Sequence, residues 1–76
     1  MNWTQVYTDT ISTLYMARYQ GYTFFKTVFR GSPWKGQYEI YTATLTGSYT
    51  QAAKGTTLRE VLDKLSLSTQ PTTLFN

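Results

Sequence analysis

The sequence contains no histidine and no cysteine, and only four of its 76 residues are acidic. The imidazole that most often moves protons in enzymes and the thiolate nucleophile are therefore both absent. Without these two residue types a structural zinc site is nearly excluded, and no disulfide can form. We therefore expect a protein that is not an enzyme and that uses neither a metal nor another cofactor.

The few carboxylates do not suggest a catalytic pair. Glu60 and Asp63 stand one helical turn apart in a predicted helix, but each has a basic residue four positions away. This arrangement favours exposed salt bridges over acid–base chemistry. No serine lies in a nucleophile-elbow pattern, and no glycine-rich loop matches a phosphate-binding motif.

Long apolar runs are missing as well. No segment approaches the ~20 apolar residues of a membrane-spanning helix. The N-terminus lacks the basic region, apolar stretch and cleavage site of a signal peptide. A cytoplasmic protein without a membrane partner is expected, and the absence of cysteine agrees with that compartment.

Aromatic residues, in contrast, are abundant: two Trp, seven Tyr and four Phe. A chain of this length buries only about 60–65% of its unfolded surface, so its core cannot hide all of these rings. Some rings are expected to face solvent or a partner. Seven basic against four acidic residues give a net charge of +3, which permits nucleic-acid binding without indicating it.

Residues 2–20 are predicted to form a first helix. The larger apolar side chains recur at spacings of three and four; they are Trp3, Val6, Tyr7, Ile11, Leu14 and Tyr15. Asn2 and Gln5 suit an N-terminal capping box, and Gly21 suits the residue that ends a helix. The many β-branched residues support an alternative, a strand over about 11–19 that turns at Gln20 and Gly21 into the next strand.

Three strands are predicted to follow. Residues 22–30 are mostly aromatic and β-branched and are bracketed by Gly21 and Gly31. A loop punctuated by glycine and proline leads to a second strand over residues 37–46. A tight turn at Gly47 leads to a shorter third strand over about 49–53.

The last predicted helix covers residues 57–66. Its apolar residues recur at i, i+3, i+4 and i+7 and form one stripe: Leu58, Val61, Leu62 and Leu65. Thr57 and Glu60 suit a capping box. Glu60 with Lys64, and Arg59 with Asp63, are favourable i,i+4 pairs.

These elements predict an α+β fold. A three-stranded antiparallel sheet has an N-terminal and a C-terminal helix, in the order α-β-β-β-α, with both helices on one face. Residues 1–66 are expected to form a single compact domain. Residues 67–76 are rich in serine and threonine and are expected to form a flexible tail.

The predicted order resembles that of double-stranded RNA-binding domains. That family has a Lys-Lys-x-x-Lys type cluster at the start of its last helix, where residues 57–62 of this chain read Thr-Leu-Arg-Glu-Val-Leu. The resemblance therefore implies the topology and not the RNA-binding activity. The stretch from Tyr22 to Leu65 is also loosely similar to the three-strand-plus-helix DNA-binding domains of integrases.

Strand alternation divides the predicted sheet into two faces. We expect the helices to cover the face that holds Phe25 and Phe29. The uncovered face would then show Phe24, Lys26, Val28 and Arg30. On the second strand we expect Tyr38 outside and, beneath the helices, Tyr41, Ala43 and Leu45.

The loop after the first strand holds the best single candidate for a contact. Trp34 stands between Pro33 and Lys35 at a hairpin tip, where its ring can enter a pocket of a partner. The alternative is a ring that folds back and caps the sheet edge. Together with the uncovered face, this loop gives the predicted partner-binding residues: Trp34, Lys35, Tyr38, Phe24, Lys26 and Arg30.

The function expected from these features is stoichiometric binding to a protein, without catalysis. Small size and the lack of a catalytic set resemble phage accessory proteins, among them many anti-CRISPR inhibitors. A phage or mobile-element factor that inhibits a host machine is the most concrete form of this expectation. The two alternatives are a nucleic-acid-binding module that uses the basic and aromatic sheet face, and a structural homo-oligomer.

Overall fold

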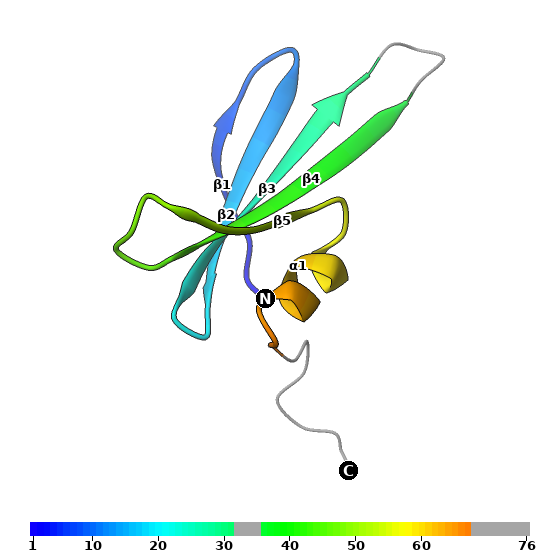
Figure 1. Cartoon of the computed structure of the whole chain (residues 1–76). Helices are drawn as coiled ribbons and strands as arrows, with labels where there is room; N and C mark the ends of the chain where they lie inside the picture. Colours follow the sequence, from blue (N-terminus) through cyan, green and yellow to red (C-terminus); the bar gives the residue numbers. More distant parts are fainter. Residues whose placement is uncertain (32–35, 68–76) are drawn as a thin grey trace.

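The computed structural model describes residues 1–31 and 36–67 as a five-stranded antiparallel sheet with a short helix on one side (Figure 1). The elements are β1 (Thr4–Thr8), β2 (Ser12–Tyr19), β3 (Tyr22–Arg30), β4 (Gln37–Leu45), β5 (Gln51–Gly55) and α1 (Leu58–Lys64). The strands lie in the sheet in their sequence order, so each one pairs with its neighbours along the chain.

The predicted α-β-β-β-α order is wrong at the N-terminus, where residues 2–20 form β1 and β2 instead of a helix. The Asp9 carboxylate accepts hydrogen bonds from the backbone N–H groups of Ile11 (2.8 Å) and Ser12 (2.9 Å) and so fixes the turn between the strands. Such Asx turns compete with helix formation, and the β-branched residues on both sides prefer strands. The alternative strand over about 11–19 is confirmed by β2.

The turn between β2 and β3 consists of Gln20 and Gly21, with φ angles of 55° and 83°. A two-residue hairpin of type I′ requires positive φ at both central residues, which glycine adopts at low cost. Gly21 therefore turns a hairpin rather than ending a helix. The predicted strand over 22–30 is confirmed by β3, while β5 begins two residues later than predicted.

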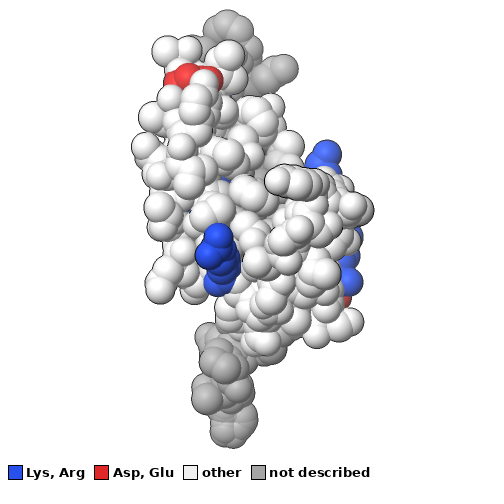
Figure 2. All heavy atoms as spheres, turned by 90° about the vertical axis from the view of Figure 1, so that its left-hand side faces the viewer, with Lys and Arg blue, Asp and Glu red and all other residues white. Residues whose placement is uncertain are grey.

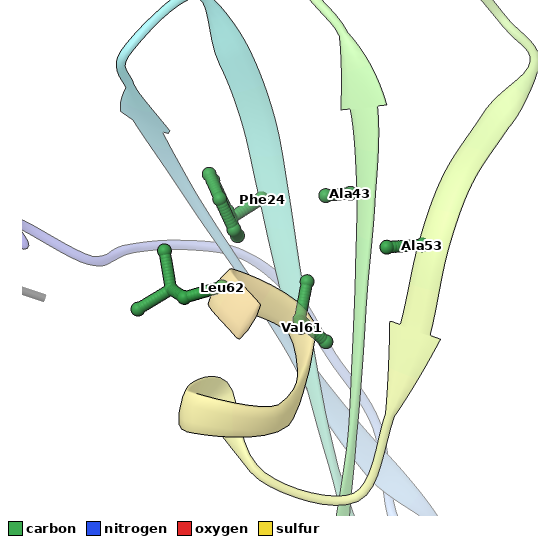
Figure 3. Close-up of a cluster of buried hydrophobic side chains, with 5 residues drawn as sticks. All are labelled: Phe24, Ala43, Ala53, Val61 and Leu62. Atoms are coloured by element: carbon green, nitrogen blue, oxygen red, sulfur yellow. The ribbon is translucent and has the colours of Figure 1, made fainter. Parts of the chain in front are cut away.

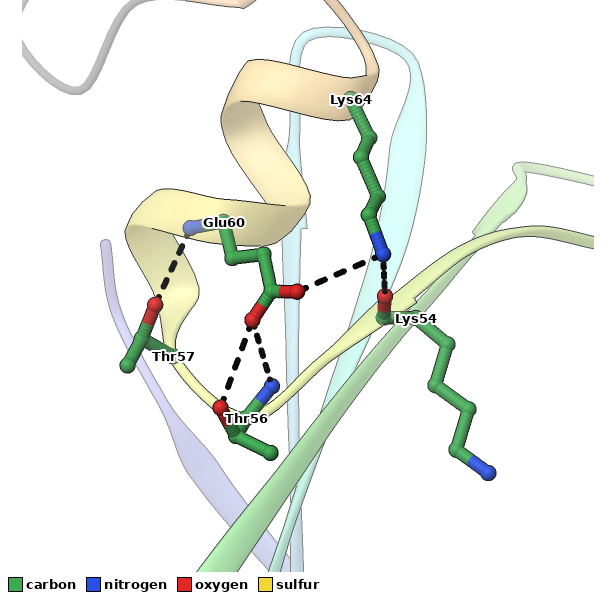
Figure 4. Close-up of polar contacts among 5 residues, drawn as sticks. All are labelled: Lys54, Thr56, Thr57, Glu60 and Lys64. Atoms are coloured by element: carbon green, nitrogen blue, oxygen red, sulfur yellow. Dashed lines mark hydrogen bonds and ion pairs between the residues drawn. The ribbon is translucent and has the colours of Figure 1, made fainter.

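The N-terminus of α1 is capped largely as predicted (Figure 4). The Thr57 hydroxyl accepts a hydrogen bond from the Glu60 backbone N–H at 3.1 Å. The Glu60 carboxylate accepts from the backbone N–H of Thr56 at 3.0 Å, one residue before the partner that a standard capping box uses. Both predicted i,i+4 pairs are present: Arg59 to Asp63 at 3.7 Å and Lys64 to Glu60 at 3.5 Å.

The C-terminus of α1 ends in a Schellman motif. The backbone N–H of Leu67 donates to the carbonyl of Leu62 (2.8 Å), and that of Ser66 donates to Asp63 (3.1 Å). Ser66 has a φ of 58°, the left-handed conformation that this motif requires. Leu67, the first residue of the predicted tail, packs against the core. The rest of the predicted tail lies outside the described residues.

The core lies between α1 and one end of the sheet (Figure 3). Val61 and Leu62 of α1 point toward the sheet residues Phe24, Ala43 and Ala53, and all five are buried. The alanines let the helix approach β4 and β5 closely, and Phe24 fills the remaining space. No element among the described residues covers the opposite face of the sheet.

Within residues 1–31 and 36–67, no helix has the length and apolar character needed to cross a membrane.

Candidate functional site

The candidate site is the sheet face opposite α1, called here the open face. The register places its residues directly opposite one another on neighbouring strands, on the side away from the buried Ala17, Phe24, Ala43 and Ala53. The open face includes Thr4, Tyr7, Ser12, Leu14, Met16, Arg18, Thr23, Phe25, Thr27, Phe29, Tyr38, Ile40, Thr42, Thr44 and Lys54.

The prediction for the faces of β3 is wrong: α1 covers Phe24, not Phe25 and Phe29. Phe24 is directly opposite Ala43 in the β3–β4 hairpin, and both are fully buried. Paired residues in an antiparallel ladder point to the same side of the sheet, so Ala43 and Phe24 have to share a face. The predictions for β4 are confirmed for Ala43 and Tyr41, whereas Leu45 is exposed.

The centre of the open face is apolar and partly exposed. Leu14, Met16, Phe25, Phe29 and Ile40 are all only partly buried. Tyr38, a predicted contact residue, is 55% exposed and stacks on Phe29 with ring centroids 4.9 Å apart. The stacked pair forms a flat aromatic surface of the kind that anchors protein interfaces.

A pocket lies at the end of the open face that is near the β4–β5 turn. It has a volume of about 350 Å³ and is lined by Thr23, Phe25, Thr44, Gly47, Ser48 and Tyr49. The Tyr49 side chain is fully exposed, so its ring stands beside the pocket without covering it. The lining combines two rings with four hydroxyl groups, one of them on the Tyr49 ring, which suits an apolar group that carries a polar end.

The charges of the open face are positive at the pocket end. Arg18 is directly opposite Thr23, and Lys54 is opposite Thr42. Figure 4 shows the Lys54 side chain pointing away from α1. On the side of the molecule drawn in Figure 2, uncharged groups cover most of the surface. An acidic patch lies at its upper end, and basic groups appear at one margin and in one isolated spot.

Lys26, a predicted contact residue, lies on the face that α1 partly covers. Its ammonium group is 4.9 Å from the ring centroids of both Trp3 and Tyr15, and Trp3 packs edge-on against Tyr41. These cation–π contacts hold the charge within the chain. Burial and a hydrogen bond to Glu39 (2.6 Å) raise the pKa of Tyr41 to about 12.

Arg30, also a predicted contact residue, binds the β1–β2 turn. Its guanidinium donates hydrogen bonds to the Thr13 hydroxyl (2.8 Å), to the Ser12 carbonyl (2.9 Å) and to the Asp9 carbonyl. Its backbone N–H donates to the Ile11 carbonyl at 2.9 Å. These bonds give Arg30 a structural role in the hairpin.

The other predicted contact residues have separate positions. Phe24 is in the core and cannot reach a partner while the chain is folded. Trp34 and Lys35 lie outside the described residues. The structure therefore does not bring the four described members of the predicted set together, and of these four only Tyr38 lies on the open face.

Sequence reasoning missed Phe25, Phe29, Arg18 and Lys54 as members of one surface. The signal that would have found the two phenylalanines is the pairing of Phe24 with Ala43, which follows once residues 31–36 are taken as the hairpin loop. Arg18 can be placed on this surface only if β2 is recognised as a strand, and the helix predicted over residues 2–20 prevented that.

Each of the four carboxylates has a hydrogen-bond or ion-pair partner within the chain. Hydrogen bonds from the Ser12 and Ile11 backbone lower the pKa of Asp9, and the Thr56 backbone bond lowers that of Glu60. Glu39 binds the Tyr41 hydroxyl, and Asp63 pairs with Arg59. In the part of the chain that the structure describes, no three residues of metal-ligating type come together.

Comparison of the chain with protein-family models, curated proteins and solved structures finds no match.

Proposed function

We propose that this chain is a non-catalytic binding module that attaches to a protein partner through its open face. The observation that carries the proposal is the apolar centre of that face, which no described element covers, whereas α1 covers one end of the other side. Uncovered apolar patches of this kind mark interaction sites on soluble proteins. Burying Phe25, Phe29 and Ile40 against a partner would remove that surface from water.

Inhibition by occlusion is the narrower form of this proposal. A small module without catalytic groups acts on a larger machine by covering a surface that the machine needs. A phage or mobile-element accessory factor that blocks a host machine in this way fits a small chain with an uncovered apolar open face. The identity of the machine would follow from the captured partner.

A nucleic-acid partner is less well supported by the positions of the cations. Lys26 contacts two rings and Arg30 binds the turn, both away from the centre of the open face. Only Arg18 and Lys54 remain on that face among the described residues, and few cations mean few phosphate contacts.

Two isoleucines allow a matched test. Ile40 lies in the centre of the open face, whereas Ile11 is 64% exposed in the β1–β2 turn. The variants Ile40→Glu and Ile11→Glu add the same charge at these two places. Circular dichroism first shows that each variant is folded. The two variants and the wild-type chain are then immobilised as separate baits and exposed to lysate before and after nuclease treatment.

We expect a protein from the lysate to bind to the wild type and to Ile11→Glu in the same molar ratio of captured protein to bait. The same protein should not bind to Ile40→Glu. Equal retention by all three baits would contradict the proposal, as would retention only before nuclease treatment. Light scattering on the wild-type chain tests the homo-oligomer alternative. A wild-type dimer that Ile40→Glu converts to a monomer would identify a second copy as the occupant of the open face.

A further inference from the structure

The pocket of the open face lies between two cations. Arg18 on β2 is directly opposite Thr23, which lines the pocket. Lys54 on β5 is opposite Thr42, whose other neighbour is the pocket residue Phe25. Because neighbouring strands are about 4.8 Å apart, both side chains are long enough to reach a group held over the pocket.

Neither cation has an ion-pair partner among the described residues. Three of the four carboxylates lie elsewhere: Glu39 points to the helix side of the sheet, and Glu60 and Asp63 belong to α1. Asp9 lies at the opposite end of the open face, about 20 Å along β2 from Arg18. The pocket end therefore has a positive field that nothing on its own face cancels.

We propose that the partner's contact segment is acidic and carries an apolar side chain, which enters the pocket while neighbouring carboxylates meet Arg18 and Lys54. This inference rests on the proposed function and names the chemistry of the partner. Phe25 and Tyr49 provide apolar contacts, and the hydroxyls of Thr23, Thr44 and Ser48 can donate to a carboxylate at the pocket mouth. Charge-assisted bonds from the guanidinium and the ammonium group then fix the orientation of the segment.

Defined probes test this proposal without knowledge of the partner. Three blocked octapeptides alternate phenylalanine with glutamate, glutamine or lysine, and a twelve-residue oligothymidylate serves as the nucleic-acid probe. Each is titrated into the full isotope-labelled chain while the backbone amide signals are followed. The expected result is binding of the glutamate peptide about tenfold tighter than of the glutamine peptide, with the largest shifts at Thr23, Phe25, Thr44 and Ser48.

Charge reversal provides the matched control. Arg18→Glu with Lys54→Glu is expected to remove the tenfold preference. Arg59→Glu, on the far side of the molecule, is expected to keep it, because Arg59 belongs to α1. Equal binding of the three peptides, tighter binding of the lysine peptide, or shifts centred on α1 would each overturn the proposal.

The peptide, oligothymidylate and pull-down results together distinguish a nucleic-acid site from a failure of the acidic-segment proposal and from a failure of the proposed function. Oligothymidylate that shifts the pocket amides while the glutamate peptide does not would overturn the proposal in favour of a nucleic-acid site. A captured protein that Ile40→Glu loses, together with no preference for the glutamate peptide, overturns only the acidic chemistry. No captured protein and no peptide binding overturn both.

Discussion

Arg30 links two hairpins through a single side chain. It belongs to β3, yet its guanidinium donates to the Asp9 carbonyl in the β1–β2 turn and to the Ser12 carbonyl and Thr13 hydroxyl at the start of β2. The planar fork of arginine can reach several acceptors at once, which the single ammonium group of lysine cannot. A basic residue at a strand end therefore acts here as a structural bridge.

Arg30→Lys is expected to destabilise the chain by about 1 kcal/mol, because charged hydrogen bonds are lost at an exposed site where water partly replaces them. Urea unfolding measures the effect. The control, Arg59→Lys, alters only an exposed helical ion pair and is expected to change stability by less than about 0.5 kcal/mol. Equal effects of the two variants would contradict the bridging role.

The Glu60 side chain occupies the space beside Gly55. A Cβ at this position would lie 2.8 Å from Glu60 Cδ and 2.9 Å from its carboxylate oxygen. Gly55→Ala is expected to push the carboxylate away from the Thr56 N–H and to cost about 1 kcal/mol. In a double-mutant cycle, Gly55→Ala should cost clearly less once Glu60→Ala is present. Additive effects would show that the contact is irrelevant.

At the scale of elements, α1 depends on its two ends and on packing. A helix of seven residues is too short to be stable alone. Thr57 closes its first turn, and the Schellman motif closes its last. Each end can be tested separately.

Ser66→Gly is expected to stabilise the chain by about 0.5–1 kcal/mol, because glycine adopts the positive φ of this position without strain. Thermal unfolding should show a higher midpoint for this variant. Ser66→Ala keeps the strain and serves as the control, with an expected change near zero or slightly destabilising. A Ser66→Gly variant no more stable than Ser66→Ala would disprove the strain argument.

Acid is expected to weaken the β1–β2 turn and the start of α1 together. Backbone hydrogen bonds hold the folded pKa values of Asp9 and Glu60 below their ordinary values. Their stabilisation is thus fully present above about pH 5, which exceeds the unfolded pKa values, and is lost as the pH falls through the folded pKa values. Thermal unfolding from pH 6 to pH 2 measures the decline. The double variant Asp9→Asn, Glu60→Gln should decline less, and an unchanged decline would refute this assignment.

Local patterns predicted some elements and misled at others. The strand over 22–30 and the apolar stripe of the last helix are strong signals, and both are correct. The helical spacing before Gly21 comes from two strands whose alternation is interrupted by a turn and by the register shift between Gln5 and Tyr7. A break in a period of two can therefore imitate a period of 3.6.

The candidate site was harder to predict than the elements. Both faces of β3 carry phenylalanine, so composition could not select the buried one, and only the pairing with Ala43 decides it. The partners of Lys26 and Arg30 come from residues 2–20, for which the sequence predicts a helix, so the sequence leaves both cations without intramolecular partners. A correct β1 and β2 would have supplied both partners.

At the scale of the whole molecule, α1 covers part of one side of the sheet and no described element covers the other. The neighbouring residues Phe24 and Phe25 point to these two different sides. Phe24→Ala is expected to cost about 3–5 kcal/mol because the ring is fully buried. Phe25→Ala, on the open face, is expected to cost about 1 kcal/mol and to weaken partner binding. Urea unfolding compares the two, and similar losses would contradict the assignment of the faces.

The order of the strands also has a consequence for how the chain folds. Because each strand pairs only with its neighbours along the sequence, no pairing has to wait for a distant segment. Hairpins form in about 1–10 μs, so the sheet can assemble hairpin by hairpin in the order in which the chain is synthesised. The last described element to emerge is α1, and only its arrival removes Phe24 from water. Until then, the nascent sheet exposes apolar groups on both sides.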